Sequence, residues 1–255
     1  MGPIQRIPIG EASSRLLVPI ANNKYDAAYA QYFTGFPWKV IPSYCGYTGA
    51  QYSGKRDRFL YSSNFKLQPP IPRTIDLRAL SSNPVRRILK RLHLLRQGGH
   101  TWQDIADYQG VVHIPYNVSI MSIFEQYAAN IPLFFPTIES MKYLYQQHRE
   151  DGVLSQISFN QVLGIASGSC LTPGVGDPNA YDEIDNIMEW VKLADFYDKS
   201  EMAGLCYFSS FEELNDMLSE VDLLQISARM QASNAARRAR ILRLWREAID
   251  RLSQV

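Results

Sequence analysis

The stretch that most constrains the fold lies between residues 111 and 136, VVHIPYNVSIMSIFEQYAANIPLFFP. A short apolar run is followed by small polar residues, then by a segment with helical spacing that starts near Ser119, and finally by a second apolar run. Two strands joined by one helix form a parallel βαβ unit, because a parallel connection requires a crossover of this length. We therefore expect an α/β fold with a largely parallel sheet, in which ligands bind beyond the carboxyl ends of the strands.

The loop and the helix start of this unit predict an anion site. Free backbone N–H groups and the positive end of the helix dipole both favour a group such as a diphosphate. Glu125 lies one turn into the helix, where a carboxylate can accept hydrogen bonds from a ribose diol. The alternative reading is that Ser119 caps the helix and that Glu125 is an ordinary exposed charge. The residues of the loop and helix start that we predict to bind the ligand carrying this diphosphate are Tyr116, Asn117, Ser119, Met121 and Ser122.

This stretch resembles the donor-binding segment of GT-B-type glycosyltransferases, in which a proline and small polar residues precede a helix bearing a glutamate. The matching residues here are Pro115, Ser119, Ser122, Glu125 and the run 130–133, Asn-Ile-Pro-Leu. Many retaining members carry two glutamates separated by seven residues. In this chain Asn117 stands at the first position and Glu125 at the second, which favours an inverting enzyme.

Further segments resemble eukaryotic and large-virus glycosyltransferase-like proteins, namely 23–26, 42–48, 190–197 and 207–214. The resemblance implies a GT-B domain of a multifunctional viral or algal-type enzyme, with rhamnose as one candidate sugar. It implies two Rossmann-type parts: a compact acceptor part of residues 1–57 with the C-terminal helix 226–255, and a donor-binding part of residues 58–225. The expected reaction is metal-independent transfer from a nucleoside diphosphate, UDP being favoured, to a glycan hydroxyl. Partner domains in a longer polypeptide are also expected.

An inverting transferase needs a base that removes the proton of the acceptor hydroxyl. Asp26 is the candidate, because it lies in the part that would face the acceptor; the alternative is an aspartate stabilised by a helix dipole. Ser63 and Lys66 follow an expected strand at 58–62, and Lys66 could neutralise the diphosphate. Arg56 raises the same question as its neighbours Lys55 and Arg58.

Three other side chains are weighed against core packing. His113 lies between apolar strand residues, so a buried core histidine is the stronger reading, although it remains a candidate near the donor. His100 and Trp102 could flank the nucleobase or serve packing alone.

The remaining pattern alternates helices with strands. We expect a strand at 16–20, a helix at 24–33 and a strand at 39–42, and then a helix over residues 84–97 that Pro84 begins and Gly98 ends. Further helices are expected from Ile138, from Ser210 with a capping-box spelling, and over 226–252. The last of these carries Leu242, Trp245, Ile249 and Leu252 on one face. The segments 68–73 and 150–182 read as loops.

Composition excludes several classes. The chain has 255 residues, 46% of them hydrophobic, which is enough for one large or two small domains. A net charge of +1 gives no overall attraction to nucleic acid, and no apolar run reaches the roughly 20 residues of a membrane span. Cys45, Cys170 and Cys206 suggest neither a disulfide framework nor a zinc site, so we expect a cytoplasmic protein, in the host cytoplasm if it is viral.

Metal sites and two other functions complete the set of hypotheses. The pairs Asp104/Asp107 and Glu183/Asp185 only superficially match metal-binding carboxylates, so no metal or cofactor is expected. A non-catalytic binding or scaffold module of the same fold is the leading alternative. Nucleic-acid binding through the arginines of the last helix is the second; these are Arg237, Arg238, Arg240, Arg243 and Arg246.

Overall fold

A five-stranded parallel sheet lies at the centre of the computed structural model, which describes residues 18–62, 89–91 (backbone only), 99–150, 152–154, 175–178, 180 and 183–253. The strands are β3 (Phe59–Ser62), β4 (Leu89–Arg91), β5 (Val111–His113), β6 (Leu133–Pro136) and β7 (Cys206–Phe208). Their spatial order is β4-β3-β5-β6-β7, and every neighbouring pair is parallel. The expected α/β class with a parallel sheet is therefore confirmed.

This strand order fixes where a ligand can bind. The chain moves outward from β3 to β4 and then returns across β3 to build β5, β6 and β7 on the other side. The direction of winding thus reverses between β3 and β5. In open parallel sheets such a switch point leaves a crevice beyond the carboxyl ends of the two strands.

The central strands are short apolar runs, as strands buried on both faces must be. Phe59, Leu60, Val111 and Val112 are fully buried, and so are the aromatic side chains of β6. Gly110 precedes β5, and a Cβ atom there would lie 2.7 Å from the carbonyl oxygen of Pro132. The close approach of the two strands therefore requires glycine at this position.

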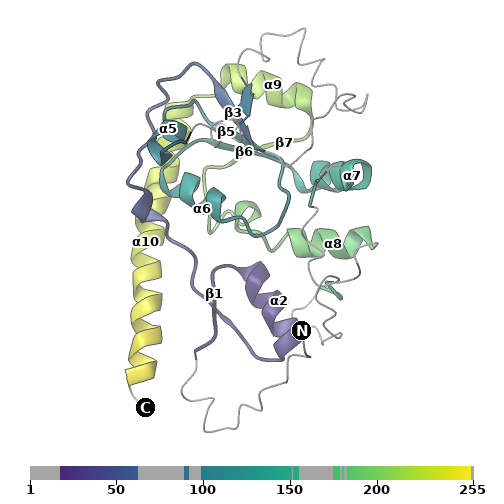
Figure 1. Cartoon of the computed structure of the whole chain (residues 1–255), viewed down its shortest axis with the longest axis vertical. Coiled ribbons are helices and arrows are strands. Elements are labelled where there is room, and N and C mark those ends of the chain that lie inside the picture. The colour runs from purple at the N-terminus through teal and green to yellow at the C-terminus, as the bar shows by residue number, and fades with distance from the viewer. Residues whose placement is uncertain are drawn as a thin grey trace.

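Helices cover the sheet on both sides, with α6 (Met121–Ala128) between the sheet and the N-terminal part and α9 (Phe211–Glu220) on the opposite side (Figure 1). The expected helices from Ile138 and Ser210 are confirmed as α7 (Ile138–His148) and α9, because Thr137 and Ser210 accept hydrogen bonds from the first-turn amides. The other helices around the sheet are α5 (Trp102–Ala106), α8 (Ile184–Val191) and the short η3 (Asp195–Tyr197).

The N-terminal part forms a second, smaller parallel unit. It comprises β1 (Ile20–Ala21), α2 (Lys24–Thr34) and β2 (Lys39–Val40), and β1 pairs with β2 in parallel. Asn23 caps α2 by accepting a hydrogen bond from the amide of Asp26 at 2.7 Å. This confirms the βαβ-like unit that the sequence predicts. A connecting segment with the 3-10 turn η1 (Gly46–Thr48) leads from it towards the larger sheet.

The last helix, α10 (Leu223–Ser253), runs past both units along one edge of the molecule (Figure 1). Its first half contributes Ile226 and Met230 to the large core. Its second half contributes Ile241 and Ala248 to a small cluster with Ile41 of the N-terminal part. The proposed division into 1–57 with 226–255 and 58–225 stays a prediction, since the helix packs against both parts.

The helix expected between β3 and α5 is wrong. The sequence predicts a helix over residues 84–97, whereas residues 89–91 form the edge strand β4, paired in parallel with β3 from Phe59↔Leu89 to Tyr61↔Arg91. The exposed backbone groups of β3 need a partner, and such tertiary pairing overrides local helix propensity. The rest of that segment and the loop 68–73 lie outside the described residues.

The segment 150–182, expected to be a loop, is described only in part. Gly152–Leu154 form a turn in which Val153 and Leu154 are buried, and the Leu154 amide donates a 3.1 Å hydrogen bond to the carbonyl of Pro115. Within the ranges that can be described, no helix is both long and apolar enough to cross a membrane.

Candidate functional site

The candidate site lies where β3 and β5 end. Ser62 and His113, the last residues of these strands, are paired, so the loops that follow them leave the sheet side by side. The loop after β5, residues 114–120, leads into α6. The loop after β3 begins at Ser63, and both Ser63 and Lys66 lie outside the described residues.

The start of α2 meets the loop before α6. The Ser119 hydroxyl donates a hydrogen bond of 2.9 Å to Oδ2 of Asp26. Nδ2 of Asn23 lies 2.9 Å from Ser119 Oγ and 2.9 Å from Asp26 Oδ2. The three side chains form a compact polar cluster, which we call the Asp26 cluster. It joins the predicted base to the predicted donor loop.

The Asp26 cluster is partly removed from solvent. Asn23 is 1% exposed, and Asp26 is half-buried. Burial raises the pKa of Asp26, and the hydrogen bonds from Ser119 and Asn23 only partly offset this effect. Both hydrogen bonds end on Oδ2, so among the described residues Oδ1 is the oxygen left for another donor.

The N-terminus of α6 is not closed by a side chain. Ile120 occupies the N-cap position and makes no side-chain capping bond, so the reading in which Ser119 caps the helix is wrong. Ser119 is instead committed to Asp26. The Ile123 amide bonds to the Ile120 carbonyl at 3.1 Å, so among the described first-turn amides of α6 those of Met121 and Ser122 keep the capacity to bind an anion.

Neighbouring loop side chains are held by the protein itself. Oδ1 of Asn117 accepts a 2.7 Å hydrogen bond from the Val118 amide. Met121 is 46% exposed, and its sulfur accepts a 3.3 Å hydrogen bond from Nδ2 of Asn22. Tyr116 and Ser122, also predicted to bind the donor, are half-buried at the same end of the unit.

Glu125 faces the connecting segment that runs beside α6. The Tyr47 hydroxyl donates a short hydrogen bond to Oε1 of Glu125, and this bond is the main reason that the pKa of Tyr47 is raised. Tyr47 itself is 70% exposed. A ligand hydroxyl could therefore reach Glu125 by replacing the tyrosine, without any rearrangement of the core.

His113 is a buried core residue, which was the stronger of its two interpretations. It is 2% exposed, its Nε2 lies 2.7 Å from Oε1 of Gln126, and its ring stacks on Phe135. Burial lowers its pKa to about 4, so the ring is neutral at neutral pH. These contacts account for His113 without a ligand.

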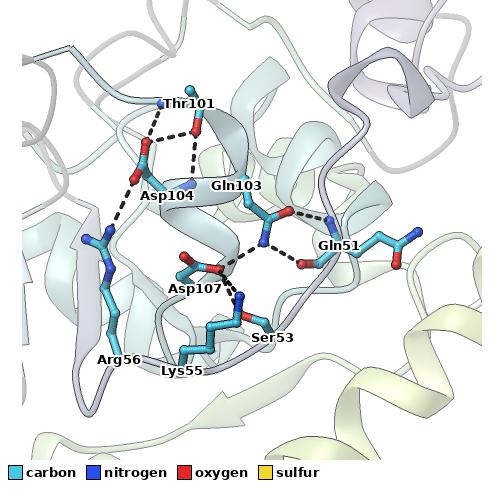
Figure 2. Close-up of polar contacts among 8 residues, drawn as sticks. All are labelled: Gln51, Ser53, Lys55, Arg56, Thr101, Gln103, Asp104 and Asp107. Atoms are coloured by element: carbon cyan, nitrogen blue, oxygen red, sulfur yellow. Dashed lines mark hydrogen bonds and ion pairs between the residues drawn. The ribbon is translucent and has the colours of Figure 1, made fainter.

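Arg56 lies at the other end of the strands, where the parallel strands begin. We call this end of the sheet its amino edge, and the end where the strands finish its carboxyl edge. The Arg56 guanidinium forms an ion pair of 3.1 Å with Asp104 (Figure 2). The same group lies 4.8 Å from the centre of the Tyr108 ring. Asp104 also closes a capping box with Thr101 at the start of α5. The structure thus does not bring Arg56 together with Ser119. His100 and Trp102 belong to this same region around α5.

Hydrogen bonds in the same region also account for Asp107, the second carboxylate of the Asp104/Asp107 pair. It accepts hydrogen bonds from Ser53 at 2.7 Å and from Gln103 at 2.9 Å (Figure 2). In the part of the chain that is described, no three histidine, cysteine or acidic side chains group in a way that could hold a metal ion.

Two buried charges were missed by sequence reasoning. Arg237 is 3% exposed, and its three nitrogens have no hydrogen-bond acceptor among the described residues. Its positive charge acts on Asp195, which is 5% exposed and whose pKa is raised by burial to about 7. The spacing of Met230, Arg237 and Ile241 on α10 could have revealed the buried arginine, because these positions share one helix face.

The other arginines of the last helix differ in their surroundings. Arg240 makes a bidentate ion pair with Glu201, and Arg238 lies 5.7 Å from the centre of the Tyr44 ring.

In comparisons with known proteins, no family model, no curated protein and no solved structure matches this chain.

Proposed function

We propose that the chain is a glycosyltransferase of GT-B type. It moves a sugar from a nucleoside diphosphate, UDP being favoured, to a glycan hydroxyl with inversion and without a divalent metal ion; rhamnose is one candidate sugar. The observation that carries the proposal is the 2.9 Å hydrogen bond between Ser119 and Asp26. It puts a carboxylate of the N-terminal part against a loop that ends in an uncapped helix at the switch point of the sheet.

Each part of this geometry has a chemical task in the proposed reaction. Oδ1 of Asp26 accepts the proton of the acceptor hydroxyl while that oxygen attacks the anomeric carbon. The bond between this carbon and the diphosphate oxygen breaks, and the electron pair leaves with the diphosphate. The amides of Met121 and Ser122 at the start of α6 stabilise the departing negative charge.

The raised pKa of Asp26 suits a base. A carboxylate whose charge is disfavoured by burial gains more by accepting a proton than one in water does. Ser119 and Asn23 fix the orientation of the carboxylate through Oδ2. The proton of the acceptor hydroxyl therefore transfers to one defined atom, Oδ1 of Asp26.

The first test is ligand-induced thermal stabilisation with UDP, GDP, dTDP, CMP and ADP, with and without magnesium. Ser122→Pro would remove a first-turn amide of α6, and Glu125→Gln would weaken a contact to ribose. Glu139→Gln, an exposed glutamate in the first turn of α7, is the matched control. We expect one nucleotide to stabilise the parent and the control but neither site variant, independently of magnesium. No shift with any nucleotide would contradict the donor site.

Catalysis is tested separately through donor hydrolysis in the absence of acceptor. The binding-module alternative rests on two contacts: Asn117 bonds to its own loop, and Glu125 is held by Tyr47. A chain that binds a nucleotide but shows neither transfer nor slow hydrolysis would support that alternative over the enzyme.

A further inference from the structure

The second half of α10 carries an apolar surface that no described element covers. Leu242, Trp245, Ile249 and Leu252 follow one another at spacings of three, four and three residues, which puts them on one face of the helix. Their exposed fractions are 47%, 43%, 56% and 47%. We call these four side chains the α10 stripe.

The stripe is not needed to hold the helix in place. A neighbouring face of the same turns already packs against the N-terminal part, where Ile241 is 3% and Ala248 is 2% exposed. Lys39 and Glu247 add an ion pair of 3.1 Å to this contact. The second apolar face is thus additional to the one that folding uses, and clustered exposed apolar side chains mark interaction sites.

The charges beside the stripe are mainly positive. Arg238 lies one turn before Leu242 on the same face, and Arg246 lies within one turn of both Leu242 and Ile249. Within residues 18–62 and 99–253 as far as they are described, neither arginine has an ion pair. Asp250 is the acidic residue nearest to this rim. A partner with negative charge fits this surface better than a neutral one.

The shape and the charge of the α10 stripe together indicate which kind of partner binds there. A second copy joined by a two-fold axis would bring equivalent surfaces together, and Arg246 would approach its own counterpart. The helix that carries the stripe lies at the edge of the molecule (Figure 1). Apolar side chains on one face of such a helix form a ridge, and helix-binding partners offer a groove to it. A bilayer interface accepts a ridge without needing a groove, and tryptophan is enriched at that depth.

We propose that α10 binds the surface of an anionic lipid bilayer. The helix lies in the plane of the interface, with the stripe in contact with the acyl boundary and Arg238 and Arg246 against lipid phosphates. The stripe extends over about 15 Å of helix, enough for reversible but not permanent attachment. This inference is independent of the proposed sugar transfer.

The test is sedimentation of the full chain with vesicles of phosphatidylcholine alone and of phosphatidylcholine mixed with phosphatidylserine. We expect binding only to the anionic vesicles, and release as salt is raised. Trp245→Ser/Ile249→Ser should weaken binding by at least about tenfold, because the inserted apolar surface is lost. Leu224→Ser is the matched control, since Leu224 is 72% exposed at the other end of the same helix.

The charge rim is tested by Arg238→Gln/Arg246→Gln, for which we expect a loss of roughly tenfold to thirtyfold. Arg229→Gln, an exposed arginine in the first half of α10, should bind as the parent does. Circular dichroism checks that each variant is folded. No binding to anionic vesicles would overturn the proposal, as would full binding by Trp245→Ser/Ile249→Ser. Self-association that Ile249→Ser abolishes, without vesicle binding, would assign the stripe to a second copy instead.

Discussion

Asp104 and Asp107, at the amino edge of the central sheet, have lowered pKa values, whereas Asp26 and Asp195, at the carboxyl edge, have raised ones. Hydrogen bonds from Thr101 lower the pKa of Asp104, and those from Gln103 and Ser53 lower that of Asp107 (Figure 2). Burial instead raises the pKa values of Asp26 and Asp195.

The difference teaches what each edge contributes. Acids that are ionised more easily in the folded state stabilise it, and at the amino edge they secure α5 and the connecting segment. Acids whose charge the fold disfavours do not stabilise it at neutral pH, and such groups are typical of sites that exchange protons or bind ligands. Asp198 differs from both neighbours at the carboxyl edge, because hydrogen bonds from Lys24 and Ser200 outweigh its burial and lower its pKa.

The largest effect is expected from Asp26→Asn. If Asp26 is the base, transfer should fall by about 10²- to 10⁴-fold. The melting temperature should stay the same or rise, because a neutral amide removes a charge that burial disfavours. Initial rates of sugar transfer and a thermal melt measure the two quantities. Retained transfer would remove Asp26 from the mechanism and leave the carboxyl edge without its proposed base.

The second effect concerns pH. The pKa of Asp195 rises from 3.8 to about 7 on folding, so its protonated form is the one that the fold favours. Its contribution is complete below about pH 4 and is lost as the pH rises towards 7, with an upper limit of roughly 4 kcal/mol. Denaturant unfolding across this range should therefore show a flatter profile for Asp195→Asn than for the parent.

Asp107→Asn tests the opposite sign in the same measurement. The pKa of Asp107 is lowered, so its contribution is present above the ordinary aspartate pKa and is lost as the pH falls through its folded value. This variant should lose stability at neutral pH and approach the parent in acid. Parallel profiles for the two variants would contradict the distinction between the edges.

A third effect is expected from Gly110→Ala at the amino edge. The new Cβ atom would lie 2.7 Å from the Pro132 carbonyl oxygen, so β5 and β6 would have to separate locally. We expect a loss of about 1–3 kcal/mol in the free energy of unfolding. Ala106, buried on α5 near the same edge, offers a comparison through Ala106→Gly, whose cost comes from lower helix propensity and the loss of one buried methyl group and should be about 1–2 kcal/mol.

The smallest effect is expected from Thr101→Ala. Removing the N-cap hydroxyl of α5 should cost about 1 kcal/mol, because one amide of the first turn loses its acceptor. Nucleotide binding should be unchanged, since this residue lies at the edge away from the Asp26 cluster. A urea titration and the nucleotide thermal shift together check both statements. A loss of nucleotide response would mean that the two edges are coupled.

Local patterns in the sequence predicted much of the fold. The βαβ unit around α6, the capped helices α7 and α9 and the long α10 all have clear periods and recognisable starts. Asn130, just before β6, has a φ of 59°, in the left-handed region that glycine and asparagine tolerate best. The edge strand β4 was assigned to the wrong class, because its pairing with β3 is not a local property.

The site was predictable only in part. Ser119 and Asp26 were each identified as candidates, but their hydrogen bond joins residues 93 positions apart, and no local pattern encodes that distance. The contact between Tyr47 and Glu125 spans 78 positions and was missed for the same reason. The burial of Arg237 depends on how α10 packs against α6, which the charge pattern obscures.

The continuity of α10 has a mechanical consequence. One uninterrupted helix of 31 residues, about 46 Å long, contributes Ile226 and Met230 to one core and Ile241 and Ala248 to the other. A stiff rod fixed at both ends does not permit the N-terminal unit to swing freely. Any opening that admits a substrate between Asp26 and Ser119 must therefore either bend this rod or slide one of its ends, and the stiffness of α10 sets the energy of that motion.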